Sequence, residues 1–249
     1  MSRIPTLADL GDVSGKRVLV RTDFNVPMEN GEITDDFRIR AALPTINWLT
    51  ERGATVVTCS HLGRPKGQRV DTESLRHVLP ALEQHLKRKV AFADDCVGPS
   101  AAAVIGAMKD GDLALLENTR FHKGEEKNDP AFVAQLVQGI DCYVDDAFGA
   151  AHRAHASIVG PPQTLPSAAG RLLQKEVEVL LGLREKPGRP FVAVLGGAKV
   201  SDKLGVIESL LKVVDALVIG GGMCFTFLAA QGYGVGDSIC ERDQIDTCK

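Results

Sequence analysis

Short apolar runs alternate along the chain with longer segments in which apolar residues recur at helical spacing. The short runs are continuously apolar, as expected for strands that are covered on both faces. We therefore predict strands at residues 17–21, 54–58, 112–116, 142–144, 191–195 and 216–219, with a further candidate at 90–93. The helical spacing predicts helices at 74–86, 99–108, 130–137, 172–183 and 201–213, and one that Asp35 or Asp36 caps and that runs to Leu49. Pro44 is expected to kink or restart that helix.

Strands that alternate with helices indicate βαβ units and a parallel sheet. The proline-rich segment 160–166 (GPPQTLP) marks a boundary, and a helical segment follows it. We assign residues 1–165 to a first domain, 166–188 to a connecting segment and helix, and 189–249 to a second domain. Because two parallel strands do not form a stable sheet by themselves, the second domain is expected to be truncated. The predicted fold class is α/β, with two Rossmann-like parallel-sheet domains joined by a helix.

Composition and charge narrow the class of protein. Hydrophobic residues make up 44% of the 249 residues and charged residues 24%, which argues against a disordered, collagen-like or disulfide-scaffold chain. The 32 acidic residues outnumber the 29 basic ones, so a general nucleic-acid-binding surface is not expected. The N-terminus lacks the apolar core of a signal peptide, and the most apolar stretch, 213–230, is broken by Asp215 and three glycines. We predict a cytoplasmic protein without a membrane partner.

Residues that bind metals are scattered, and we predict no metal site in this chain. The six cysteines show no zinc spacing, and we interpret them as reduced thiols at small buried positions: Cys59, Cys96, Cys142, Cys224, Cys240 and Cys248. His152 and His155 could ligate a metal, but no further ligand completes a set, and hydrogen bonding in a loop is the alternative. We interpret three further histidines as structural or solvent-exposed residues: His77, His85 and His122. Asp145 and Asp146 could bind a metal, although Asp145 could equally anchor an arginine.

Polar side chains follow the predicted strands at the sheet edge where parallel α/β proteins bind ligands. Four arginines belong to this set although the chain is net acidic: Arg38, Arg64, Arg120 and Arg153. Arginine suits the bidentate capture of phosphate or carboxylate. Asp23 and Asn25 could bond a ligand hydroxyl, and His61 shares a loop with Arg64. Each arginine alone could be a solvated surface residue, but together they predict a site for a small polyanion.

A second anion site is predicted where the strand at 191–195 leads into a helix. The segment GGAKVSDK (196–203) lets backbone N–H groups approach a phosphate, and a helix N-terminus favours an anion. Lys199 and Lys203 are four residues apart and would share a helical face. The three glycines at 220–222 allow a nucleotide to lie close to the backbone, whereas a Walker A spacing and a G-x-G-x-x-G strand-end fingerprint are absent. Two phosphate-handling sites on separate domains suggest phosphoryl transfer.

Seven segments in family order resemble phosphoglycerate kinase. They are RTDFNVP (21–27), SHLGRP (60–65), ENTRF (117–121), GEEKND (124–129), YVDDAFGAAHRAHAS (143–157), LGGAKVSDKL (195–204) and IGGGMCFTFL (219–228). The resemblance implies reversible transfer of the acyl phosphate of 1,3-bisphosphoglycerate to ADP, giving 3-phosphoglycerate and ATP in glycolysis, by a monomeric enzyme. It also implies that Mg²⁺ enters with the nucleotide.

The resemblance also assigns roles residue by residue. The acid substrate would contact Asp23, Asn25, Arg38, His61, Arg64, Arg120 and Arg153. The nucleotide would contact Gly197, Ala198, Lys199, Lys203 and Gly222. Arg38, Lys199 and Lys203 would be the catalytic residues, because they neutralise charge on the transferred phosphoryl group and the nucleotide phosphates.

The sequence departs from the family pattern in length. Family members continue beyond residue 249 with the aspartate that holds the nucleotide-bound Mg²⁺, so this chain is expected to be inactive by itself. The alternative is a non-catalytic module that binds 3-phosphoglycerate. A third hypothesis, a nicotinamide-dependent dehydrogenase, lacks its glycine fingerprint.

Overall fold

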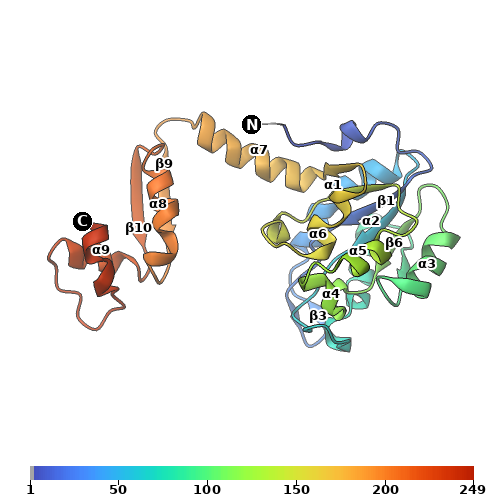
Figure 1. Ribbon diagram of the computed structural model, residues 1–249, viewed down its shortest axis with the longest axis horizontal. Coiled ribbons are helices and arrows are strands. Elements are labelled where there is room, and N and C mark those ends of the chain that lie inside the picture. Colours follow the sequence, from blue (N-terminus) through green and yellow to red (C-terminus); the bar gives the residue numbers. More distant parts are fainter. Residues whose placement is uncertain (1–2) are drawn as a thin grey trace. The chain divides into compact units, whose positions relative to one another are not determined.

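A computed structural model describes residues 3–249, and the chain divides into two compact units, Met1–Val177 and Glu178–Lys249. The division falls inside the helix α7 (Arg171–Glu185), which lies within the segment predicted to connect the domains. Figure 1 labels the main elements along the colour gradient of the sequence. No helix of residues 3–249 combines the length and the apolar character needed to cross a bilayer.

The first unit is built on a six-stranded parallel sheet in the order β5-β6-β4-β1-β7-β8. Its strands are β1 (Arg17–Arg21), β4 (Thr55–Cys59), β5 (Ala91–Ala93), β6 (Leu113–Leu116), β7 (Cys142–Asp145) and β8 (Ser167–Ala169). The five strands predicted in this part of the chain are confirmed to within a residue at each end. The edge strand β8 was missed, because its three residues follow the prolines of the predicted boundary.

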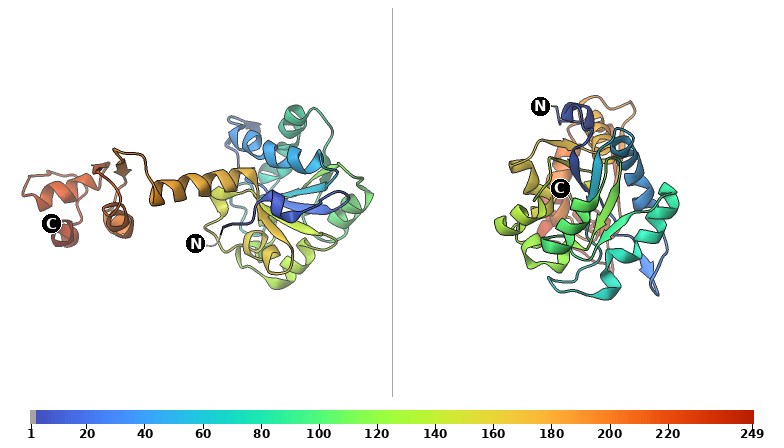
Figure 2. Two further views of the ribbon diagram at one scale, coloured as in Figure 1. Left: turned by 90° about the horizontal axis from the view of Figure 1, so that it is seen from above. Right: turned by 90° about the vertical axis from the view of Figure 1, so that its right-hand side faces the viewer.

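Helices cover both faces of this sheet (Figure 2). One layer holds α1 (Phe37–Thr50) and α2 (Leu79–Leu86), and the other holds α3 (Gly98–Ala107), α5 (Pro130–Leu136) and α6 (Ala156–Val159). Successive strand residues point to opposite faces, so Val18 and Val20 of β1 pack in one core and Leu19 in the other. The continuous apolar strands of this unit are therefore buried on both faces, as predicted.

Short elements complete the first unit. They are the hairpin of β2 (Met28–Glu29) and β3 (Glu32–Ile33), the one-turn helix α4 (Lys123–Glu126), and the 3₁₀ turns η1 (Leu7–Leu10), η2 (Asp71–Glu73), η3 (Leu75–His77), η4 (Thr119–Phe121), η5 (Phe148–Ala150) and η6 (Pro161–Gln163). Two helix predictions for this unit need correction, and a third, at 201–213 in the second unit, holds only for residues 204–210. The helix α1 runs unbroken through Pro44. The helix predicted at 74–86 begins only at Leu79, because Ser74 and Leu75 donate to Glu117 instead of extending a helix.

The second unit holds a two-stranded parallel sheet of β9 (Val192–Gly196) and β10 (Ala216–Gly220). Its helices and turns are η7 (Ser201–Lys203), α8 (Leu204–Leu210), α9 (Cys224–Ala230), η8 (Arg242–Gln244) and α10 (Ile245–Cys248). The prediction that both faces of these strands are covered is wrong here. Val194 is 73% exposed and Val218 50%. The unit's small core packs against Leu195, Leu217 and Ile219, which alternate with these valines along the strands, so the other face of the sheet is left uncovered.

The cysteines follow the same division between the units. All six are free thiols, and Cys59, Cys96 and Cys142 are buried as predicted. Cys224, Cys240 and Cys248 are only half-buried, which contradicts the prediction for them. These three belong to the second unit, whose core is too small to enclose them.

Candidate functional site

Loops at the carboxyl ends of β1, β4 and β7 come together around Asp23 and Asn25. The Asp23 carboxylate is nearly buried, and its Oδ2 accepts a hydrogen bond from Arg38 Nη1 at 2.8 Å. Asn25 Oδ1 accepts from the backbone N–H of Gly63, in the loop after β4, at 2.9 Å. A Cβ atom at Gly149, after β7, would lie 2.8 Å from Asp23 Oδ2. The chain crosses from one half of the sheet to the other at β1, so the site lies where the strand order reverses.

His61 is buried just after β4 and is held in its neutral form. Its Nδ1 lies 3.0 Å from Nη2 of Arg21, and a guanidinium can only donate, so Nδ1 accepts and the proton sits on Nε2. Burial, followed by the positive charges of Arg21 and Arg120, lowers the pKa of His61 to about 2. The imidazole therefore offers an N–H donor but no positive charge near neutral pH.

Arg21, at the end of β1, is completely buried and belongs to a chain of polar groups that sequence reasoning missed. Its Nε donates to Ser157 Oγ at 2.8 Å and its Nη1 donates to the backbone oxygen of Thr22. Ser157 donates in turn to the buried carboxylate of Glu125, from Oγ at 2.6 Å and from its N–H at 2.9 Å. The chain lets a buried cation and a buried anion keep hydrogen-bond partners, and it orients His61. In the sequence, Arg21 appeared only as the last residue of a predicted strand and the first residue of RTDFNVP.

Arg120 brings a partly satisfied guanidinium to the same edge of the sheet. Its Nη1 donates to the backbone oxygen of Gly63 at 2.9 Å, and its Nε lies 3.5 Å from Glu126 Oε1 but has no hydrogen-bond partner among residues 3–249. Burial is the largest cause that lowers the pKa of Arg120, and the positive charge of Arg153 lowers it further. Arg153 therefore lies within electrostatic reach of Arg120. Two arginines with N–H groups to spare favour an anion between them.

Arg38, Arg64 and Arg153 extend their side chains toward solvent at this edge. The side chains of Arg64 and Arg153 make no hydrogen bond within the part of the chain that the structure describes, whereas Arg38 is tied to Asp23. The structure thus brings Asp23, Asn25, Arg38, His61, Arg120 and Arg153 together through contacts or mutual charge. Arg64 belongs to the same loop as Gly63, which bonds Asn25. The backbone N–H of Arg64 donates to Glu73 Oε1 at 3.1 Å.

Two buried polar side chains in the loop after β6, Glu117 and Asn118, fix the positions of the neighbouring loops. Asn118 Nδ2 donates to the backbone oxygens of Leu62 and Glu73 at 2.7 and 2.8 Å. Its Oδ1 accepts from the N–H of Arg120 at 3.0 Å. Glu117 accepts from Ser74 Oγ at 2.6 Å and from the N–H of Leu75 at 2.8 Å. The loops after β4 and β6 are therefore fixed to each other.

Asp145 ends β7 and Asp146 follows it, and Asp146 has a structural role in this geometry. Asp146 Oδ1 accepts from the N–H groups of Leu172 and Leu173, at 2.9 and 3.3 Å, and so caps α7. Burial raises the pKa of Asp146 to about 7, and burial also raises the pKa of Asp145. Within residues 3–249, no third metal-binding side chain joins Asp145 and Asp146, or His152 and His155.

The two glycine segments of the second unit pack against each other. Gly221 has φ +68°, and a Cβ there would lie 2.9 Å from the backbone N and O of Gly197. The N–H of Met223 donates to the Gly197 oxygen at 2.8 Å, and a Cβ at Gly222 would lie 3.3 Å from the Ala198 oxygen. Only glycine fits this close approach without displacing the backbone. Gly197, Ala198 and Gly222 therefore form one glycine-lined surface at the carboxyl ends of β9 and β10.

Two expectations for the lysines and the helix start of this surface are corrected. Lys199 lies in irregular chain and Lys203 ends η7, so they do not share a helical face. The N–H groups at the start of η7 donate to the side chain of Glu241. This carboxylate accepts from the N–H of Val200 at 2.5 Å, and from the N–H and Oγ of Ser201 at 3.1 and 2.6 Å. The helix start therefore binds an anion, but that anion is the protein's own carboxylate. A nucleotide phosphate would depend on Lys199, Lys203 and the glycine backbone.

The described residues of the second unit do not provide a Mg²⁺ cage. Magnesium prefers carboxylate and other oxygen ligands, and no group of three such ligands gathers near the glycine surface in residues 178–249. The side chain of Asp202, in η7, is the acid nearest in sequence to Lys203, and one carboxylate is not a site.

Comparisons with known proteins show the family of the chain. The family model described as phosphoglycerate kinase matches residues 7–249. The chain is 57% identical over 244 residues to phosphoglycerate kinase of Sinorhizobium fredii, and 58% identical over 240 residues to that of Moorella thermoacetica. These alignments cover 98% and 96% of this chain and 61% of each relative, so the chain spans about 61% of the length of these curated relatives.

Solved structures give the same result. The structure of phosphoglycerate kinase from Coxiella burnetii matches with a TM-score of 0.88 and 42% identity, over 99% of this chain and 62% of that one. The enzyme from Pyrococcus horikoshii matches with a TM-score of 0.85 and 33% identity, over 98% and 64%. With the family match over residues 7–249 and the loops described above, the chain belongs to the phosphoglycerate kinase family.

Proposed function

We propose that the protein takes part in reversible phosphoryl transfer between 1,3-bisphosphoglycerate and ADP, and that the first unit binds the acid substrate. The observation that carries this proposal is the meeting of Asp23, Arg38, His61 and Arg120 at the carboxyl edge of one parallel sheet. Three of these groups offer N–H donors and one offers a carboxylate. A small phosphorylated hydroxy acid needs both kinds of partner, cations for its phosphate and carboxylate and an acceptor for its hydroxyl.

The chemistry fits a site without a covalent nucleophile. In the direction of ATP synthesis, a terminal phosphate oxygen of ADP attacks the phosphorus of the acyl phosphate, and the bond from that phosphorus to the carboxyl oxygen breaks. The leaving carboxylate becomes the carboxylate of 3-phosphoglycerate, so no proton transfer to the protein is required. Catalysis then consists of positioning and charge neutralisation. Neutral His61 can donate from Nε2 without acting as a base.

We assign the charge-neutralising roles to Arg38, Lys199 and Lys203. Arg38 is 45% exposed in its side chain and is oriented by Asp23, so its remaining N–H groups are free to meet a phosphoryl group. Arg64, Arg120 and Arg153 would hold the non-transferred phosphate. Lys199 and Lys203, beside the surface of Gly197, Ala198 and Gly222, would contact the nucleotide phosphates, with Mg²⁺ entering as part of the nucleotide. A monomeric state and a cytoplasmic location belong to the same proposal.

We expect the 249-residue chain to bind 3-phosphoglycerate but not to sustain turnover. Support comes from the second unit, where the strand faces are exposed and no oxygen cage for Mg²⁺ is found among residues 178–249. The second candidate, a non-catalytic module that binds 3-phosphoglycerate, is favoured by the same observation. The two hypotheses share the acid site and differ in whether the nucleotide is used.

An NMR titration of the chain with 3-phosphoglycerate tests the acid site. Amide shifts are expected at residues following β1, β4, β6 and β7. Arg64→Ala should raise the dissociation constant by about tenfold, because a charge-assisted hydrogen bond of about 1.5 kcal/mol is lost. The matched control is Arg17→Ala, an exposed arginine at the opposite, amino end of β1, which should leave the constant within about twofold.

Either of two results would contradict the proposal. One is the absence of shifts in a chain whose spectrum is dispersed. The other is an equal loss of affinity in Arg64→Ala and Arg17→Ala, which would indicate attraction by net charge instead of a built site.

A further inference from the structure

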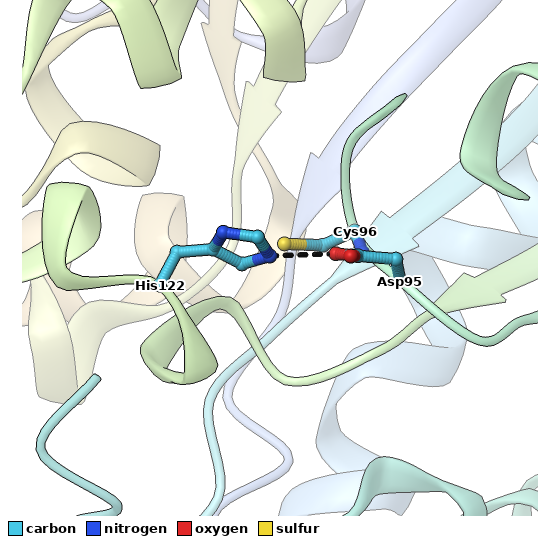
Figure 3. A group of neighbouring side chains, drawn as sticks. All are labelled: Asp95, Cys96 and His122. Carbon is cyan, nitrogen blue, oxygen red and sulfur yellow. Dashed lines mark hydrogen bonds and ion pairs between the residues drawn. The ribbon is translucent and has the colours of Figure 1, made fainter. Parts of the chain in front are cut away.

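A second group of reactive side chains lies outside the proposed substrate and nucleotide sites. Asp95 and Cys96 follow β5, and His122 follows η4, which comes after β6. Figure 3 shows the Cys96 sulfur and a carboxylate oxygen of Asp95 facing the His122 ring. The ligand atoms of all three residues lie within 4.8 Å of one another. Neighbouring strands of the sheet thus deliver a thiol, an imidazole and a carboxylate to one point.

The three side chains are held in position by contacts that leave their ligand atoms directed inward. Asp95 Oδ1 accepts from the N–H of Cys96 at 2.7 Å and lies 2.6 Å from His122 Nε2. The His122 ring packs against Phe132, with ring centroids 5.2 Å apart. Asp95 remains 43% and His122 32% exposed in their side chains, whereas Cys96 is buried. The group is therefore closed on the sulfur side and open to solvent on the other.

We propose that Asp95, Cys96 and His122 bind one borderline-soft divalent cation, with Zn²⁺ as the preferred ion and solvent as the fourth ligand. Cys sulfur, His nitrogen and carboxylate oxygen are the ligands of Zn²⁺ in proteins, at about 2.0–2.3 Å from the metal, usually in a tetrahedron. Three protein ligands and an open side provide that geometry after a small separation of Asp95 from His122. Mg²⁺ and Ca²⁺ prefer all-oxygen sites, so this group discriminates against them.

A metal ion at this point takes the place of protons. Zn²⁺ binds a thiolate and an unprotonated imidazole nitrogen, so its binding releases the thiol proton of Cys96 and the proton between His122 Nε2 and Asp95 Oδ1.

Titration of the reduced chain with Co²⁺ tests the proposal, because cobalt replaces zinc and its thiolate complexes absorb light. We expect one equivalent of Co²⁺ to produce thiolate-to-cobalt charge-transfer and d–d bands, and one equivalent of Zn²⁺ to abolish them. Cys96→Ser should remove the bands. The matched control is the double variant Cys240→Ser and Cys248→Ser, which removes two half-buried thiols of the second unit and should keep them.

A second measurement does not depend on the folding of Cys96→Ser. In ¹⁵N-histidine spectra of the unaltered chain, one equivalent of Zn²⁺ should shift Nε2 of His122, assigned with His122→Gln, and leave His77 and His152 in place. The proposal is overturned if Co²⁺ gives no bands, if the bands persist in Cys96→Ser or vanish in the double variant, or if His122 does not respond to Zn²⁺. Neither experiment uses 3-phosphoglycerate, so its outcome is independent of the proposed function.

Discussion

At the scale of the residue, burial decides what each polar side chain can do. The sequence does not show whether His61 is exposed or buried. In the structure it is buried against Arg21, and its pKa is lowered to about 2. Asp146 comes directly after β7, a position from which an aspartate can bind a ligand. Its carboxylate caps α7 instead. The same chemical group thus becomes a donor, a ligand or a cap according to what surrounds it.

Asp146 makes the stability of the protein depend on pH. Its pKa is about 7 in the folded chain against an ordinary value of 3.8, so between about pH 4 and pH 7 the folded state holds a proton that the unfolded state has released. The free energy of unfolding contributed by Asp146 is therefore greatest below about pH 4 and falls as pH rises to about 7, by at most about 1.4 kcal/mol per pH unit.

Urea denaturation from pH 4 to pH 8 checks this expectation. Relative to Asp146→Asn, which cannot titrate, the unaltered chain should lose stability through that window and then remain level. Asp110→Asn, at an exposed aspartate, is the control and should not remove the slope. A rise in the relative stability of the unaltered chain with pH would show that Asp146 is ionised in the folded state.

At the scale of the element, caps and strand ends determine where chemistry is presented. The helix α5 begins at Pro130 because Asp129 Oδ1 accepts the N–H groups of Ala131 and Phe132. The turn η7 uses the same device at long range, since its cap, Glu241, lies 40 residues from Ser201. A local cap can be read from the sequence, whereas a distant one cannot.

Glu241→Ala should loosen the glycine and lysine surface of the second unit. The Val200 and Ser201 N–H groups would lose their acceptor, and their hydrogen exchange should become roughly fivefold faster, the effect expected for the loss of an ordinary cap. Asp237→Ala, at an exposed acid of the same unit, is the matched control and should leave those rates unchanged. Equal exchange in both variants would mean that Glu241 does not support η7.

At the scale of the whole molecule, the two units differ in how completely their sheets are covered. In the first unit β1 and β4 are buried along almost their whole length between two helix layers. In the second unit Val192, Val194 and Val218 are each about half exposed or more. The proposed acid site therefore lies on a sheet covered on both faces, and the proposed nucleotide site lies on two strands with a small core.

Turnover by the 249-residue chain is expected to be absent. In an assay that couples 1,3-bisphosphoglycerate formation from 3-phosphoglycerate and Mg-ATP to NADH oxidation, the chain should not exceed the rate without protein. Phosphoglycerate kinase of Sinorhizobium fredii is the positive control. Sustained turnover by the pure chain would contradict both this expectation and the hypothesis of a non-catalytic module.

The sequence alone determined the alternation of strands and helices and the positions of the polar residues that follow the strands. These features are local, because side-chain periodicity and turn residues act over a few positions. It also determined that Asp23, Asn25 and the arginines would lie at one edge of a parallel sheet, since all parallel strands end there. The strand β8 escaped prediction because its three residues directly follow the prolines of the predicted boundary.

Which of these residues are buried, paired or free depends on how distant segments pack. Arg21 and Glu125 became a buried polar chain, Glu241 became the anion at η7, and Asp95, Cys96 and His122 met at one point. Each of these arrangements joins residues that are separated along the chain. The separation is 136 positions between Arg21 and Ser157, 32 between Ser157 and Glu125, and 27 between His122 and Asp95. Burial and hydrogen bonding depend on the packing of distant segments, and that packing has no signature in the spacing of residues along the chain.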